Sequence, residues 1–144
     1  MDHIFAYGQR TKRLFEHLCS GVGKEYGLSQ NDMAVLLFLT NNKPLDTAND
    51  IVKYRGISKS WVCKSVDELT NRGYLFTEQD KADRRRIHLR VNPSAEKIVC
   101  RLQDAKSQFF EIIFKDFTAD DRVEFGRLLD KIMENTKEGL EQWQ

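Results

Sequence analysis

Basic side chains gather in two short stretches near the middle of the chain. One stretch, between residues 81 and 86, holds Lys81, Arg84, Arg85 and Arg86. The other, residues 58–65 with the sequence SKSWVCKS, carries Lys59 and Lys64. Guanidinium and ammonium groups this close together favour the binding of phosphates or other anions. Residues 43–90 hold 11 basic and seven acidic side chains, so this part of the chain has a net charge of +4.

The flanking segments differ in charge. Residues 1–42 have no net charge and residues 91–144 have a net charge of −3. This asymmetry predicts a polyanion-binding module carried on a separate scaffold. The chain has 144 residues, of which 40% are hydrophobic and 31% charged. A chain of this length can fold as one domain without disulfides or a structural metal.

Several classes of protein are disfavoured. The longest apolar run, residues 33–39, is too short to span a membrane, and the N-terminal residues lack a signal-peptide core. Three cysteines without paired spacing predict reduced thiols in the cytoplasm. The sequence has no Cys-x-x-Cys or His-x-x-x-His pair, no nucleophile–base pair and no cofactor loop. We therefore expect a protein that is not an enzyme and needs no metal or cofactor.

Helical spacing of apolar residues predicts the scaffold that positions the basic groups. A first helix over residues 2–19 is expected to break at Gly21, Gly23 and Gly27. Capping boxes are predicted at Ser29 with Asp32, Thr47 with Asp50, and Thr118 with Asp121. They would open a helix that is buried all round from Met33 to Leu39, a short helix ending at Arg55-Gly56, and the last helix of the chain.

A helix opened by Ser58 follows the short third helix. Val62, Val66 and Leu69 form its inward stripe, and the opposite face carries Ser60, Lys64, Asp67 and Asn71. Gly73 is expected to end it. Residues 74–79 and 86–91 then alternate as strands joined by a charged tip. Asn92 and Pro93 are predicted to open a helix that reaches about Phe114.

This order of elements is the winged helix-turn-helix arrangement. We expect a mainly α fold with a small β-hairpin wing, a winged helix-turn-helix module and long dimerisation helices. The second helix of such a pair enters the DNA major groove with its N-terminal residues at base edges. The candidate residues there are Ser58, Lys59, Ser60, Trp61 and Lys64. The alternative is a core-packing helix with a solvated face.

The wing supplies a second set of candidates. A guanidinium on a narrow projecting loop can enter a minor groove, where the negative potential is strongest over narrow A·T tracts. Arg84, Arg85 and Arg86 qualify, and Asp83 is near enough in sequence to hold the Arg85 guanidinium in a fixed pose. The alternative is a basic loop that only improves solubility.

The residues from Gly56 to Asn92 resemble the DNA-binding core of MarR-type transcriptional regulators. The stretches SKSWVCKSVDELTNRGYL and DKADRRRIHLRVN carry the resemblance. The family's wing signature, Asp-x-Arg-x-x-x-Leu-x-Leu-Thr, is matched by Asp83, Arg85, Leu89, Val91 and Asn92. The resemblance extends over almost the whole chain and implies one MarR-like domain over residues 1–144. Within it, residues 29–92 would be the DNA-binding module, and residues 1–22 and 93–144 the dimerisation helices.

The resemblance also implies a function. Family members are homodimers that bind a pseudo-palindromic operator in double-stranded DNA. The resemblance therefore implies that the chain is a repressor of transcription and that a small-molecule or redox effector releases it from the operator. Arg85 would enter the minor groove, and Ser60, Trp61 and Lys64 would face the major groove. Two departures stand out. Trp61 replaces a small hydroxyl residue and could contact a thymine methyl or fold back, and Thr77 replaces an arginine that would contact a phosphate.

Aromatic residues crowd the end of the fifth helix. A single helix cannot bury apolar groups on so many sides, and a second copy of the chain would cover them. The predicted dimerisation residues are Phe109, Phe110, Ile113, Phe114, Phe117, Leu128 and Ile132. A monomeric core cluster is the alternative.

Two further questions have alternative answers, the role of Cys19 and the function of the whole protein. Cys19 in the first helix is either a redox switch or a small buried hydrophobe, and the absence of surrounding tyrosines in the sequence favours the buried role. A winged-helix adaptor that binds proteins and not DNA is the competing function.

Overall fold

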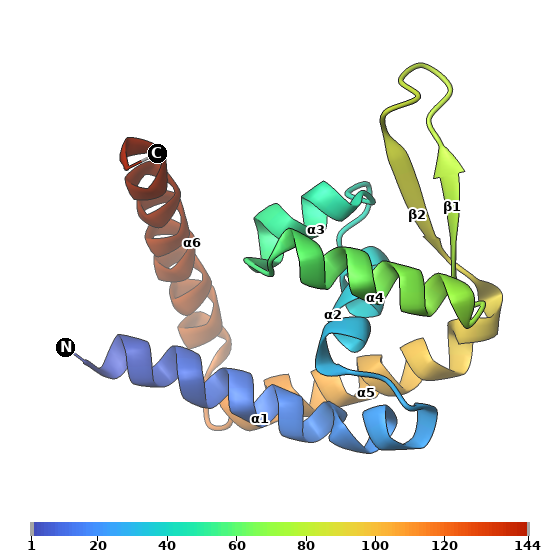
Figure 1. The fold of residues 1–144 in the computed structure, drawn as a ribbon. Coiled ribbons are helices and arrows are strands. Elements are labelled where there is room, and N and C mark those ends of the chain that lie inside the picture. The colour runs from blue at the N-terminus through green and yellow to red at the C-terminus, as the bar shows by residue number, and fades with distance from the viewer. Residues whose placement is uncertain (1, 144) are drawn as a thin grey trace. The chain divides into compact units, whose positions relative to one another are not determined.

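Over residues 2–143, which the computed structural model describes, six α-helices, one 3-10 turn and a two-stranded hairpin form. In chain order they are α1 (His3–Tyr26), α2 (Gln30–Asn41), α3 (Ala48–Arg55), α4 (Lys59–Asn71), β1 (Leu75–Gln79), β2 (Ile87–Val91), the 3-10 turn η1 (Pro93–Ala95), α5 (Glu96–Ile113) and α6 (Ala119–Gln142) (Figure 1). The chain divides into two compact units between Phe109 and Phe110. The predicted fold class, mainly α with a β-hairpin wing, is confirmed.

Helix α2 forms the centre of the first unit. Its residues from Met33 to Leu39 are all buried, as the apolar run predicts. Helix α4 packs on α2 and α3 through Val62 and Leu69, which are fully buried. Leu75 of β1 and Leu89 of β2 join the same core. The outer face of α4 is therefore the face left free for a partner.

Side-chain caps fix where three helices begin. Ser29 with Asp32 caps α2, Thr47 with Asp50 caps α3, and Thr118 with Asp121 caps α6, each with both hydrogen bonds of a capping box. These three predictions are confirmed. Gly56 ends α3 and Gly73 follows α4, both in the left-handed conformation that glycine adopts without strain.

The predicted break in the first helix is wrong at two of its three glycines. Helix α1 runs through Gly21 and Gly23 and ends at Gly27, whose φ is 64°. Gly23 lies where α1 closely approaches its own C-terminal turn and α2. A Cβ there would lie 2.9 Å from the Leu28 carbonyl oxygen and 3.0 Å from Met33 Cε. Gly23 is thus a packing glycine.

The hairpin is antiparallel, with Leu75 opposite Val91 and Gln79 opposite Ile87. It projects beyond the helices of its unit (Figure 1). The Leu89 N–H donates to the Asp46 carbonyl oxygen at 2.7 Å, so β2 is also bound to the connection between α2 and α3. The 3-10 turn precedes α5, which therefore begins three residues later than the Asn92 cap predicts and ends at Ile113.

The second unit is built on phenylalanines. The Phe114 ring stacks on Phe110 at 5.9 Å and meets Phe117 and Phe125 edge-on at 5.3 and 5.6 Å. The Arg122 guanidinium lies 5.3 Å from the Phe114 ring centroid. This cluster joins the end of α5 to the start of α6. None of the residues of α6 is buried.

Candidate nucleic-acid interface

The five candidates from α4 lie together at its exposed N-terminal end. Ser58 caps the helix by accepting a hydrogen bond from the Trp61 N–H at 3.4 Å. All five side chains are exposed, whereas the buried face carries Val62, Ser65 and Leu69. The first turn of a helix has free N–H groups and a positive dipole end, which favour an anion such as a phosphate. This end of α4 can therefore approach both the phosphates and the base edges of a duplex.

Trp61 and Lys64 form a pair on this surface. The Trp61 side chain is 52% exposed, so it does not fold back into the core. The Lys64 ammonium lies 4.9 Å from the centre of the Trp61 ring. A cation–π contact at an exposed site contributes about 0.5–1 kcal/mol. The contact restrains a flexible lysine and leaves the opposite face of the indole available.

The wing tip is ordered by its own hydrogen bonds. Asp80 Oδ1 accepts from the N–H groups of Ala82 and Asp83, both at 2.8 Å. The Gln79 side-chain amide donates to the Arg84 carbonyl oxygen at 2.9 Å, and the Asp80 N–H donates to the Arg86 carbonyl oxygen at 2.9 Å. These bonds hold a tight turn whose basic side chains, Lys81, Arg84, Arg85 and Arg86, are all exposed.

Asp83 contacts Arg85 differently from the prediction. Its Oδ1 atom accepts from the Arg85 backbone N–H at 3.0 Å. Within residues 2–143 no ion pair joins the Asp83 carboxylate to the Arg85 guanidinium. The two-residue spacing suits an Asx turn, in which a carboxylate caps the backbone two positions on. Asp83 therefore shapes the loop and leaves the Arg85 guanidinium free to reach a ligand.

An ionic network that sequence spacing does not reveal joins the wing to the α2–α3 connection. His88 Nδ1 lies 2.7 Å from Asp46 Oδ1, and His88 Nε2 lies 2.8 Å from Asp80 Oδ2. Arg90 donates to Asp46 and, at 3.3 Å, to Glu78. Asp46 and His88 are 42 residues apart in sequence, so no local pattern links them.

The network shifts the pKa values of its members. Hydrogen bonds to Asp46 and then to Asp80 raise the pKa of His88. The His88 hydrogen bond, with backbone hydrogen bonds from Asp83 and Ala82, lowers the pKa of Asp80 to about 2. Burial disfavours the charged form of Asp46, but hydrogen bonds from His88 and Arg90 outweigh it, so its pKa is lowered. Each of these shifts favours the ionised form of its group.

The predicted dimerisation residues fall in both units. Phe109 packs edge-on against Phe15 of α1 at 5.5 Å. Phe110, Ile113, Phe114 and Phe117 lie at the end of α5 and in the turn after it, and Leu128 and Ile132 lie on α6. Phe110, Phe117, Leu128 and Ile132 are each between 39% and 45% exposed. These half-exposed apolar groups are available to a second chain.

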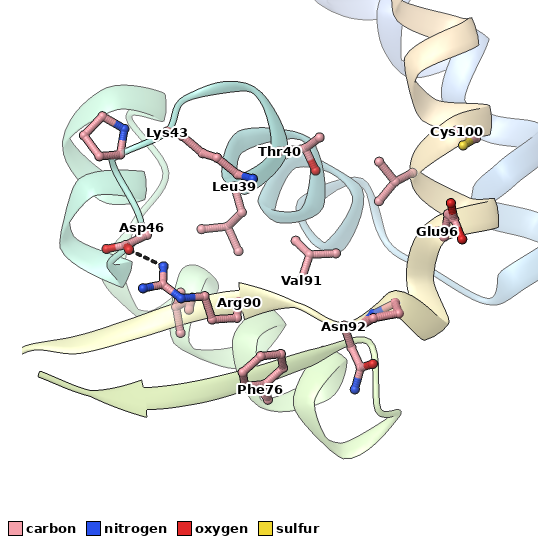
Figure 2. A pocket seen from close by; sticks show the side chains of 14 residues that line it. Leu39, Thr40, Lys43, Asp46, Phe76, Arg90, Val91, Asn92, Glu96 and Cys100 are labelled. Carbon is pink, nitrogen blue, oxygen red and sulfur yellow. Dashed lines mark hydrogen bonds and ion pairs between the residues drawn. The ribbon is translucent and has the colours of Figure 1, made fainter.

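Two cavities lie in the first unit. The larger, of about 840 Å³, is bounded by the end of α2, by β2 and by the start of α5 (Figure 2). Figure 2 shows Arg90 paired with Asp46 at one side of it and Phe76, Asn92 and Glu96 around it. The smaller, of about 390 Å³, touches Cys19. Cys19 is 1% exposed, and burial raises the pKa of its thiol, so the structure favours the buried-hydrophobe role.

The described residues contain neither a membrane-spanning helix nor a metal-binding cluster. Between residues 2 and 143, no helix is both long and apolar enough to cross a bilayer. The same part of the chain contains no group of three or more histidine, cysteine, aspartate or glutamate side chains arranged to hold a metal ion.

Comparison with known proteins identifies the module. Residues 26–86 match the family model described as the MarR family. A comparison with curated proteins finds no match. Among solved structures, a MarR transcriptional regulator from Methanosarcina mazei is 20% identical, with a TM-score of 0.78 over 96% of this chain and 99% of that one. A MarR protein from Peptoclostridium difficile is 18% identical, with a TM-score of 0.81 over 100% and 93%.

A third similar structure is BpsR from Bordetella bronchiseptica, whose DNA binding is regulated by 6-hydroxynicotinic acid. It is 21% identical to this chain, with a TM-score of 0.67 over 90% of this chain and 92% of BpsR. The structural similarity to these three proteins establishes the fold of this chain. The family model covers helices α2 to α4 and the wing tip. The chain therefore has the winged helix-turn-helix fold, and its residues 26–86 are similar to the MarR family.

Proposed function

We propose that the protein is a homodimeric transcriptional regulator that binds a specific, pseudo-palindromic DNA site. The observation that carries the proposal is the exposed N-terminal end of α4 together with an ordered wing that carries three exposed arginines. Both belong to the segment that matches the MarR family model. A family module can keep its fold without DNA binding, but its exposed face would then have no reason to combine a helix N-terminus, Lys64 and Arg84–Arg86.

In the proposed complex, α4 lies in the major groove and the wing follows the adjacent minor groove. Ser60, Trp61 and Lys64 face base edges, and Ser58 and Lys59 lie at the helix end that favours a phosphate. Arg85 enters the minor groove, while Arg84 and Arg86 contact phosphates on either side. Asp83 contributes through the loop conformation and not through a contact with the bases.

Dimerisation sets the geometry of the DNA site. The apolar groups at the end of α5 and along α6 would be covered by a second copy, and a two-fold dimer presents two modules to DNA. Two modules read half-sites about one helical turn apart, or a multiple of it. We infer a cytoplasmic repressor, released by a small-molecule effector that binds a cavity of the module. The buried Cys19 thiol gives a redox effector less support.

Selection from a random duplex library with the purified protein tests this function. We expect recovery of a two-fold symmetric site with half-sites about one turn apart, bound with a Kd of about 10⁻⁸ to 10⁻¹¹ M at physiological salt. The matched variants are Arg84→Gln with Arg85→Gln, in the wing, and Arg10→Gln with Arg13→Gln, exposed on α1. The wing pair should lose binding and the α1 pair should keep it.

The competing adaptor function gives a different result. A folded protein that recovers no sequence, shows no salt-dependent affinity for duplex DNA and is indifferent to both arginine pairs would overturn the proposal. Specific binding without symmetry in the recovered site would retain the DNA-binding function and reject the two-fold dimer.

A further inference from the structure

His88 connects two segments that are distant in sequence. One ring nitrogen lies 2.7 Å from Asp46 in the α2–α3 connection, and the other lies 2.8 Å from Asp80 at the end of β1. The histidine side chain is only 17% exposed. The α2–α3 connection leads directly into α3, which Thr47 caps and which packs into the core through the buried Ile51. Asp80 holds the wing tip through two backbone N–H groups. His88 is thus the middle of a chain of contacts that runs from the core to the wing tip.

Both contacts require the doubly protonated ring. An ionised carboxylate can only accept hydrogen bonds, so each ring nitrogen that faces one must carry a proton. A neutral imidazole has one N–H, and its second nitrogen would direct a lone pair at a carboxylate oxygen. Loss of the proton therefore breaks either the contact with Asp46 or the contact with Asp80.

The other charged groups around His88 do not replace this proton. From the α3 side, Asp46 and Asp50 are acidic; from the hairpin, Asp80 and Glu78 are acidic and Arg86 and Arg90 are basic. Arg90 divides its donors between Asp46 and Glu78. The positive charge of Arg86 helps to lower the pKa of Asp50, after the hydrogen bonds from Thr47 and Asp46. The charges counted with imidazolium are three positive and four negative. Deprotonation therefore leaves the turn end of the hairpin more negative, next to Arg84 and Arg86, which contact phosphates in the proposed complex.

We propose that His88 is a positioning residue for DNA binding: as an imidazolium it ties the wing tip to the α2–α3 connection, and loss of its proton weakens binding by freeing Arg84–Arg86. The proposal rests on the DNA-binding function proposed above. His88 acts through Asp80 and contacts no nucleotide itself. The Leu89 N–H bond to the Asp46 carbonyl persists without the proton, so the wing stays folded and loses only the restraint on its tip.

The direction of the pH dependence follows from the raised pKa of His88. The tie is complete below the ordinary histidine pKa of about 6.5 and is lost as the pH rises through the higher value in the folded protein. DNA phosphates favour the proton further, so binding takes up protons in that range. A shift of one pKa unit between free and bound protein corresponds to about a tenfold change in Kd.

The first measurement needs no DNA. An NMR titration of the His88 ring signals in the protein without DNA should give a midpoint above the ordinary histidine pKa of about 6.5, with the amide signals of Ala82 and Asp83 moving at the same midpoint. Asp80→Asn keeps an oxygen acceptor for the two tip amides but removes the charge beside His88, so it should lower that midpoint. A His88 midpoint at or below the ordinary histidine value of about 6.5 would overturn the proposal, whether or not the protein binds DNA.

The second measurement is the Kd for a fluorescein-labelled duplex recovered by the selection, between about pH 6 and pH 9. We expect the Kd of the wild-type protein to rise about five- to tenfold across this range. His88→Gln should bind more weakly at the low end and lose most of the pH dependence. His17→Gln, an exposed substitution on α1, is the control and should keep the wild-type profile. Equal pH profiles for His88→Gln and wild type would overturn the proposal, and absence of any binding would instead count against the DNA-binding function.

Discussion

At the scale of single residues, the face of α4 is defined by which side chains the core leaves out. Val62, Ser65 and Leu69 are buried and Val66 is partly buried, whereas Trp61, Cys63, Lys64, Asp67 and Glu68 are exposed. Trp61 is the largest of the exposed group and lies under the Lys64 ammonium. Restraint of Lys64 by the indole lowers the side-chain entropy lost on binding DNA. In the proposed complex this pair reads one or two neighbouring base pairs.

Lys64→Ala tests whether this pair reads bases. If Lys64 donates to a guanine, we expect a loss of about 1–3 kcal/mol and a relaxed preference at one base pair. The measurement is the affinity for the selected duplex and for its single-base variants. Lys53→Ala, an exposed substitution on α3, is the control. A uniform loss over all duplexes would assign Lys64 to a phosphate.

Arg85 tests the minor-groove contact. We expect Arg85→Ala to weaken binding mainly to duplexes with A·T-rich flanks, because narrow minor grooves concentrate negative potential. Affinities for duplexes with A·T-rich and G·C-rich flanks measure the effect. Arg84→Ala is the neighbouring control and should weaken binding to both alike. No difference between flanks, in wild type and variant, would exclude the minor-groove role.

At the scale of elements, the sequence predicts helix starts better than helix ends. Caps are local: Ser29 with Asp32 and Thr47 with Asp50 satisfy backbone groups within four residues, so their spacing is visible in the sequence. Gly23 was misinterpreted because its role depends on a contact with Met33, ten positions away. The link between His88 and Asp46 was missed for the same reason. The residues of the α4 face were predictable since helical spacing alone separates them from the core.

Gly23 and Gly21 make a matched test of this interpretation. Gly23→Ala gains about 1 kcal/mol of helix propensity, but its Cβ would meet the Leu28 carbonyl oxygen at 2.9 Å. Overpacking of this kind costs about 1–3 kcal/mol, so we expect a net loss of stability. A Cβ at Gly21 has nothing within 4 Å, and Gly21→Ala should stabilise the protein by about 0.5–1 kcal/mol. Denaturant unfolding measures both, and equal stabilisation by the two variants would contradict the packing role of Gly23.

At the scale of the whole molecule, α6 is the element that a single chain leaves without a core. Its 24 residues include none that is buried, although the helix carries a stripe of large apolar side chains. Val123, Leu128, Leu129, Ile132, Met133 and Leu140 are between 40% and 74% exposed. A large exposed apolar stripe marks a surface that interacts with another protein, a membrane or a ligand. The proposed dimer assigns the stripe this role, and it makes DNA affinity depend on α6, which lies outside the module that reads DNA.

Substitution of this stripe tests that dependence. Leu128→Glu with Ile132→Glu places two charges among apolar side chains, and burial of an unpaired charge at an interface is strongly unfavourable. We expect a monomer by sedimentation, and at least a tenfold loss of affinity for the two-fold site but little change for a single half-site, since the DNA-binding module is untouched. Lys131→Glu with Lys137→Glu adds the same number of acidic groups at lysines of α6 and is the control. A monomeric wild-type protein with full affinity for the symmetric site would show that α6 has another partner.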